Sequence, residues 1–312
     1  MGTTHQTEQR GLWLGLLAVT LFALSLPMTK LAVGSHDAPL LSPWFSSFGR
    51  AAVAGLLSMA YLWYSRARWP VGNQWRTLVL IGLGNAIGFP ILQTVGLLYV
   101  PSSHAAVFNG LLPLATAAIA ALIFHQHTPI RFWLWAGLAA LFVVLFALWR
   151  AYVNDGFIAV HGADVLLFFA IVFCGFGYAQ GAKLAREMPA AHSLSWMLVV
   201  FLPITLPCAI YTAPSQSIPW SAWLGFAYIA IFSMWIGMMI WFYALHIGGA
   251  VRVSQVQILQ PFLTILFSIP LLGESFSMST LLFAAAVIWA AYMGKRVPIA
   301  SNVAAPSSTN NV

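Results

Sequence analysis

The sequence predicts an all-α membrane protein with ten transmembrane helices, arranged as two inverted five-helix repeats. Three observations support this fold class. The 312 residues are 61% hydrophobic and 6% charged, whereas soluble domains carry roughly 25% charged residues. The mean hydropathy is +0.87, and apolar stretches run almost from end to end of the chain. Finally, two stretches from different halves align without a gap and share polar residues and a proline.

The apolar stretches are long enough to cross a bilayer. A hydrocarbon core of ~30 Å needs about 20 apolar residues in a helix that rises ~1.5 Å per residue. The expected spans are approximately 11–33, 43–64, 77–99, 105–124, 130–149, 163–184, 193–212, 221–245, 253–272 and 277–294. The longest interior loop, 151–162, separates a first repeat at 11–150 from a second at 163–296. The polar tail at 297–312 is expected to be disordered and cytoplasmic.

The charged residues of the loops predict the orientation. With the N-terminus inside, ten lysines and arginines fall on the cytoplasmic side and two, Lys30 and Arg150, on the outer side, as the positive-inside rule requires. Both termini are therefore expected to be cytoplasmic. Because each half has five spans, the second half must enter the membrane from the opposite side, which makes the repeat inverted. The same rule accounts for the net charge of +7, so no nucleic-acid partner is expected.

The two aligned stretches, 105–126 and 253–274, predict a cavity between the halves. The matched positions are Asn109 with Gln257, Pro113 with Pro261 and Thr116 with Thr264, and the second stripe also contains Ser254. These residues recur at steps of three and four, so each set shares one helix face. An amide facing lipid would cost a few kcal/mol in lost hydrogen bonding. The stripes are therefore expected to face either a cavity or a neighbouring helix, and each proline is expected to kink its helix there.

Further side chains are candidates for the cavity wall. Arg50 lies inside the second span, where its guanidinium would suit a substrate carboxylate, although a static network with backbone carbonyls, or snorkelling outward, accounts for it better. Lys30, near the outer end of the first span, is expected to snorkel toward the interface. Aromatic side chains would suit an apolar substrate unless they only pack against neighbours. The aromatic candidates are Phe89, Tyr99, Tyr178, Trp235 and Trp241.

Other chemistry is not indicated. The chain has no HExxH motif, no paired intramembrane aspartates and no GxSxG turn, so an enzyme is not expected, and neither is a metal or cofactor. No acidic residue is expected at mid-membrane, and His104, beside a loop, is expected at the surface. The GxxxG pairs Gly84 with Gly88 and Gly177 with Gly181 are expected to let helices approach closely.

Three short motifs complete the pattern. They are FALSLPMTK (22–30) with its lysine, SSFGRAAVAGLLSM (46–59) with its single arginine, and VRVSQVQILQPFLTILFSIPLLGESFSMSTLLFAAAVI (251–288) with Pro261, Gly273 and Glu274. Together with the topology, they resemble the drug/metabolite transporter superfamily, in particular the EamA-type permeases of bacteria. The resemblance covers about residues 11–296. The first half departs from the pattern, because His125 and Gln126 stand where Gly-Glu is usual.

The resemblance implies a multi-pass permease of the bacterial inner membrane. It would export a small metabolite, such as an amino acid or a related compound, by alternating access, with the lipid bilayer and the small-molecule substrate as its partners. Pro113 and Pro261 would be helix breaks beside the cavity, while Arg50 and Lys30 would belong to a polar network near its outer half. The alternatives are a non-transporting binding or scaffold protein of the same fold and an intramembrane enzyme. The sequence leaves the substrate, the coupling ion and the oligomeric state open.

Overall fold

The protein is a bundle of helices. The computed structural model describes residues 2–125, 128–155, 162–185, 187–248, 253 and 255–297. Within these residues the backbone is helical apart from the connections, and its β structure is one isolated bridge between Gly34 and Pro39. The all-α fold class predicted from the sequence is confirmed.

The first half contains five helical stretches, of which the third and fourth are interrupted. Its elements are α1 (Gly2–Val33), α2 (Pro43–Tyr64), α3 (Gln74–Gly82), η1 (Leu83–Gly88), α4 (Phe89–Tyr99), α5 (Ser102–Asn109), α6 (Leu112–Ile123) and α7 (Ile130–Asp155). The third stretch becomes a π-helix at η1, and the fourth breaks at Gly110 and Leu111. Pro113 lies in the first turn of α6, where its missing N–H costs no helical hydrogen bond.

The described residues of the second half repeat this order. Its elements are α8 (Gly162–Leu184), α9 (Ala190–Tyr211), α10 (Trp220–Ala227), η2 (Tyr228–Gly237), α11 (Met238–Gly248), η3 (Gln255–Leu259), α13 (Gln260–Leu272) and α14 (Met278–Lys295). The third stretch again contains a π-helix, η2. The fourth changes from the 3₁₀-helix η3 to α13, with Pro261 in the first turn of α13.

The register that pairs Asn109 with Gln257 also aligns these elements. It places the first residue of α6 on the first residue of α13, and the first residue of α7 on that of α14. It also places η1 within η2. The two halves therefore share the order of their helices and the positions of their irregular segments.

Seven helical stretches of the described chain are long and apolar enough to cross a membrane, and two shorter apolar helices cover Val256–Leu272 and Met278–Gly294. The 22-residue helix α2 is not among the seven, because Arg50 and several serines lower its hydropathy. One helix, or two or three consecutive helical elements, coincide with each expected span. By length and hydropathy, however, the described residues support seven spans, and the number ten stays a prediction.

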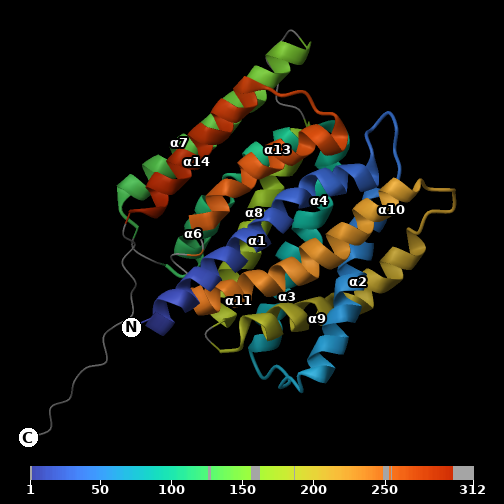
Figure 1. Ribbon diagram of the computed structural model, residues 1–312, viewed down its shortest axis with the longest axis vertical. Helices are drawn as coiled ribbons and strands as arrows, with labels where there is room; N and C mark the ends of the chain where they lie inside the picture. The colour runs from blue at the N-terminus through green and yellow to red at the C-terminus, as the bar shows by residue number, and fades with distance from the viewer. Residues whose placement is uncertain are drawn as a thin grey trace, which may run out of the picture.

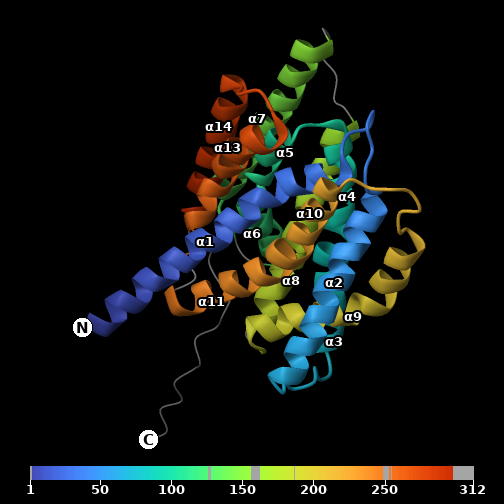
Figure 2. The same cartoon turned by 45° about the vertical axis from the view of Figure 1, so that its right-hand side comes forward.

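Helices from the two halves pack alternately across the bundle. α2 packs along α9 and α7 packs along α14, and both views show these two pairs on opposite sides of the molecule (Figure 1, Figure 2). Between them, α1 packs against α11 and α13, while α8 packs against α4 and α6. When the two halves are exchanged, the α1–α11 contact becomes the α8–α4 contact and the α1–α13 contact becomes the α8–α6 contact. The α2–α9 and α7–α14 contacts stay the same. The interrupted stretches of each half thus lie against the first helix of the other.

Glycines allow the closest of these contacts. A Cβ atom at Gly84 would lie 2.5 Å from the carbonyl oxygen of Phe173 and 2.9 Å from the amide nitrogen of Gly177. A Cβ atom at Gly88 would overlap the Phe173 ring. The close packing expected for Gly84, Gly88 and Gly177 is confirmed. A Cβ atom at Gly181, by contrast, would meet nothing within 4 Å.

Candidate functional site

A cavity that we call the central cavity lies between helices of the two halves, and it encloses about 810 Å³ of empty space, part of it open to solvent. Its walls come from α1, α2, η1, α4, α5 and α6 of the first half and from α8, α9, η2, α11, η3 and α13 of the second. Apolar side chains such as Leu26, Met197 and Met234 form part of the wall. The polar lining consists of Ser25, Arg50, Asn85, Gln93, Asn109, Tyr178, Ser233, Gln257 and Gln260.

Irregular backbone surrounds this cavity. The π-helices contribute Asn85 and Ser233, and the segments that end at the breaks before α6 and α13 contribute Asn109 and Gln257. Inside a membrane, irregular backbone is tolerated where it is buried in protein or lines a cavity, and π-turns are frequent at functional sites. The interruptions of the helices and the polar lining are therefore parts of one feature.

Equivalent positions of the two halves line the same cavity. In the register of the aligned stretches, several lining residues of the first half align with lining residues of the second half. The pairs are Leu26 with Cys174, Asn85 with Ser233, Asn109 with Gln257, and Leu112 with Gln260. Each half thus presents equivalent positions to the same space, but with different side chains.

The amides of the lining retain hydrogen-bonding capacity. Gln93, which is 3% exposed, donates from Nε2 to Oδ1 of Asn109 at 3.3 Å. Asn85 lies over Gly177, where a Cβ atom would approach its Oδ1 to 2.5 Å. That oxygen is buried and has no hydrogen-bond partner among the described residues. A few convergent polar groups in a mostly apolar cavity are typical of a ligand site.

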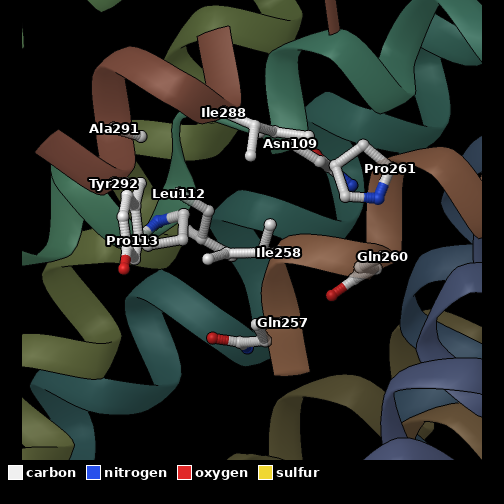
Figure 3. Close-up of a pocket in the computed structure, with 11 residues that line it drawn as sticks. Asn109, Leu112, Pro113, Gln257, Ile258, Gln260, Pro261, Ile288, Ala291 and Tyr292 are labelled. Carbon is white, nitrogen blue, oxygen red and sulfur yellow. The ribbon is translucent and has the colours of Figure 1, made fainter. Parts of the chain in front are cut away.

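A second cavity shares part of this lining and encloses about 480 Å³ of empty space, part of it open to solvent. Figure 3 shows Asn109 and Pro113 of the first half around it, together with Gln257 and Pro261 of the second. Tyr292 of α14 also lines this cavity. These four stripe residues therefore lie at cavity walls, and their contact with a substrate stays a prediction.

The two threonines of the stripes lie elsewhere. Thr116 donates its hydroxyl hydrogen to the Leu112 carbonyl of its own helix at 2.8 Å. Thr264, 1% exposed, donates to the Ala23 carbonyl of α1 at 2.9 Å. Neither lines the two cavities, and Thr264 joins α13 to α1 in the manner of the helix-contact alternative. Ser254 lies outside the described residues.

The aromatic candidates divide in the same way. Phe89 and Tyr178 line the central cavity. Tyr99 is 55% exposed and stacks on His36 with a centroid distance of 4.9 Å. Trp241 is buried with its ring against Phe22 at 6.3 Å, and Trp235 packs among the apolar residues beside α9 without lining either cavity.

Lys30 belongs to a polar cluster at the end of the bundle where α1 finishes. Its Nζ donates to the carbonyl oxygens of Leu97 and Val100 at the C-terminal end of α4. Beside it, the Glu274 carboxylate accepts hydrogen bonds from the backbone N–H of Ser102 at 2.7 Å and from the Ser102 hydroxyl at 2.8 Å. The cation thus satisfies carbonyls at a helix C-terminus and the anion caps a helix N-terminus. Lys30 lines neither cavity.

His104 is not at the surface, so that prediction is wrong. Its Nε2 lies 2.6 Å from Oδ1 of Asp164, and the two side chains are 5% and 4% exposed. The rings of Phe108 and Phe146 flank the imidazole at centroid distances of 5.5 Å and 4.7 Å. The cause is tertiary: the first turn of α5 packs inside the bundle against the first turn of α8. The Asp164 carboxylate is therefore buried together with the imidazole.

The sequence analysis missed five polar lining residues: Ser25, Asn85, Gln93, Ser233 and Gln260. The available signal was the presence of polar side chains inside apolar spans. Extending the register of the aligned stretches would also have paired Asn85 with Ser233. No group of three or more potential metal ligands occurs within the described part of the chain.

Known proteins share this architecture. The profile of the EamA-like transporter family matches residues 9–148 and 161–293. The chain belongs to the EamA-like transporter family. The family resemblance inferred from the sequence is thus confirmed. This protein is a multi-pass membrane transporter.

Relatives of this EamA-like protein are found in Bacillus subtilis (strain 168). The uncharacterized transporter YdeK is 38% identical over 265 residues, which cover 83% of this chain and 88% of YdeK. The uncharacterized transporter YyaM is 23% identical over 193 residues, covering 61% of this chain and 63% of YyaM. A crystal structure of a protein 17% identical in sequence matches with a TM-score of 0.61 over 91% of this chain and 96% of that chain, which supports the same fold.

Proposed function

We propose that the protein is a secondary transporter that exports a small metabolite across the bacterial inner membrane by alternating access. The observation that carries the proposal is the central cavity, whose polar lining comes from both halves at their interrupted helices. Many secondary transporters bind substrate at the interface of two repeats, beside discontinuous helices. The outward direction rests on the resemblance to EamA-type exporters.

The two halves are proposed to be inverted repeats, 11–150 and 163–296. The shared order of helices, the common register of the interruptions and the exchangeable contacts between helices support this relation. The loop charges support an orientation with both termini in the cytoplasm. In that orientation the cluster of Lys30 and Glu274 lies at the outer end. One half rocks against the other around the central cavity, while Lys30 joins α1 to the end of α4 and Glu274 joins the end of α13 to the start of α5.

Within the cavity, Asn109 and Gln257 are proposed to contact the substrate. They occupy equivalent positions in the two halves, directly before the breaks that precede α6 and α13. Their amides can donate and accept hydrogen bonds, so they suit the polar groups of a small metabolite. Pro113 and Pro261 lie in the first turns after these breaks, where they lack the backbone N–H that would continue a helix through the break.

Transport by reconstituted protein tests this function. The purified protein is placed in liposomes loaded with single amino acids or related metabolites, and substrate-dependent flux is measured against liposomes without protein. Asn109→Ala and Gln257→Ala are expected to lower flux about tenfold or more, since each removes hydrogen bonds to the substrate. Thr20→Val is the matched control, because the Thr20 hydroxyl donates to the Leu16 carbonyl of its own helix. Membrane abundance should be similar for all variants.

Two outcomes would contradict the proposal. Absence of flux for every compound, with a protein that is folded by its thermal transition, would favour the non-transporting binding or scaffold protein. Normal flux in both Asn109→Ala and Gln257→Ala would mean that these amides only join helices.

A further inference from the structure

Arg50 is a buried cation that faces the central cavity. It lies in α2, is 6% exposed and forms part of the cavity wall. Its Nε has no hydrogen-bond partner within the described chain. Arginine stays protonated in proteins, and a buried charge is costly unless it is paired and hydrogen-bonded. The side chain therefore offers unused donors to whatever occupies the cavity.

The described carboxylates do not balance this charge. Asp37 and Glu187 are exposed. Asp164 pairs with His104 at 2.6 Å, and Glu274 caps α5 at the end of the bundle. None of these four lines the cavity. Among the residues described there, Arg50 is accordingly the source of a net positive charge.

The rest of the lining defines what kind of anion fits. Phe22, Leu26, Met197 and Met234 supply apolar surface, and methionine side chains adapt to varied apolar shapes. The amides supply neutral donors and acceptors. An ammonium group would find no described carboxylate in this wall and would be repelled by the Arg50 guanidinium.

We propose that the transported substrate is a small monocarboxylate with an apolar body, whose carboxylate is bound by Arg50. This inference rests on the proposed transport function and names the chemical class that the cavity selects. The guanidinium offers a planar fork of donors that matches a carboxylate bidentately. The apolar body lies against the aromatic, leucine and methionine side chains, while the amides orient the carboxylate end.

Four matched probes test the class on the intact protein in lipid nanodiscs. Isocaproate has the carboxylate and the apolar body, isocaproamide removes the charge, isopentylamine reverses it, and leucine adds an ammonium group. Thermal stability is measured against each probe, because a ligand that binds the folded state raises it. Isocaproate should raise the melting temperature most, leucine less, and the amide and amine should leave it unchanged.

Three variants assign the effect to Arg50. Arg50→Gln should weaken isocaproate binding roughly 10- to 100-fold, as expected for loss of hydrogen bonds to a charged group. Arg50→Lys keeps the charge but not the fork, and should bind with intermediate affinity. Arg76→Gln, at an exposed position on α3, is the matched control and should bind as the unaltered protein does. Should Arg50→Gln fail to fold, the four probes on the unaltered protein and Arg50→Lys still decide the question.

The outcomes separate this inference from the transport function itself. Equal binding of isocaproate by Arg50→Gln would overturn the role of Arg50, and so would stronger stabilisation by leucine or isocaproamide than by isocaproate. Absence of stabilisation by isocaproate in the unaltered protein would overturn the substrate class. Flux of an uncharged compound that persists in Arg50→Gln would overturn the inference and leave transport intact. Binding of isocaproate with no flux of any compound would overturn transport and leave the binding site intact.

Discussion

Gly84→Ala tests the contact that holds η1 against α8 beside the cavity. The added Cβ would lie 2.5 Å from the Phe173 carbonyl oxygen, 2.9 Å from the Gly177 amide nitrogen and 3.0 Å from the Gly177 Cα atom. Carbon atoms in contact normally lie about 3.5–4.0 Å apart. All three opposing atoms belong to the backbone of a helix, so they cannot rotate away. The two helices must therefore separate by roughly 0.5–1 Å.

The expected cost follows from this overlap. Forcing an extra carbon into a close-packed contact typically costs about 1–3 kcal/mol. Alanine also favours a helical backbone over glycine by about 1 kcal/mol, which offsets part of the cost. Gly181→Ala in α8 is the matched control, because its Cβ would meet nothing within 4 Å. Gly181→Ala makes the same gain in helix propensity without the overlap. The difference in the free energy of unfolding between the two variants therefore measures the cost of the overlap, about 1–3 kcal/mol.

Thermal unfolding of both variants in the same detergent measures this difference. Gly84→Ala should melt below the unaltered protein, and Gly181→Ala should melt at or above it. Transport should fall in Gly84→Ala as well, since Asn85 is the next residue and would move with η1. Equal melting temperatures for the two alanine variants would refute the close contact between η1 and α8.

Two further substitutions probe the polar clusters away from the cavity. Glu274→Gln weakens the charged cap on Ser102 and should lower stability by about 1–2 kcal/mol, whereas the exposed Glu187→Gln should change it by less than about 0.5 kcal/mol; equal melting temperatures would contradict the cap. Asp164→Ala removes the partner of buried His104 and should cost about 3–5 kcal/mol, and a double-mutant cycle with His104→Ala should give a coupling energy above about 1 kcal/mol; simple additivity would argue against the pair.

Hydropathy and spacing were sufficient to locate the helices and the breaks. The apolar stretches coincide with helices because backbone hydrogen bonds must be satisfied within each segment in lipid. Pro113 and Pro261 lie in the first turns of α6 and α13, where the missing N–H of a proline costs no helical hydrogen bond. The residues that adjoin these points, Asn109 and Gln257, were consequently predicted to face a cavity, and both line one.

Faces predicted across an interruption were less reliable. A period of 3.6 residues assumes one continuous α-helix, but a π-turn or a break changes the rotation of every residue that follows. Thr116, which was placed on the face of Asn109, lies beyond the break at Gly110 and Leu111 and lines neither cavity. Burial of His104 against Asp164 was also not predictable, because it depends on how α5 and α8 pack.

The two halves share the architecture of the cavity, but in the described lining the charged residue comes from the first half. The register that pairs Asn109 with Gln257 places Leu198 of α9 at the position equivalent to Arg50 of α2. Leu198 is 1% exposed and packs in the apolar cluster beside α2. A rocking motion needs equivalent helices and breaks in both halves, whereas selection of a carboxylate needs a single cation facing an apolar wall. In the transport mechanism proposed above, the symmetric features would allow the cavity to change its access, and the asymmetric Arg50 would select the substrate.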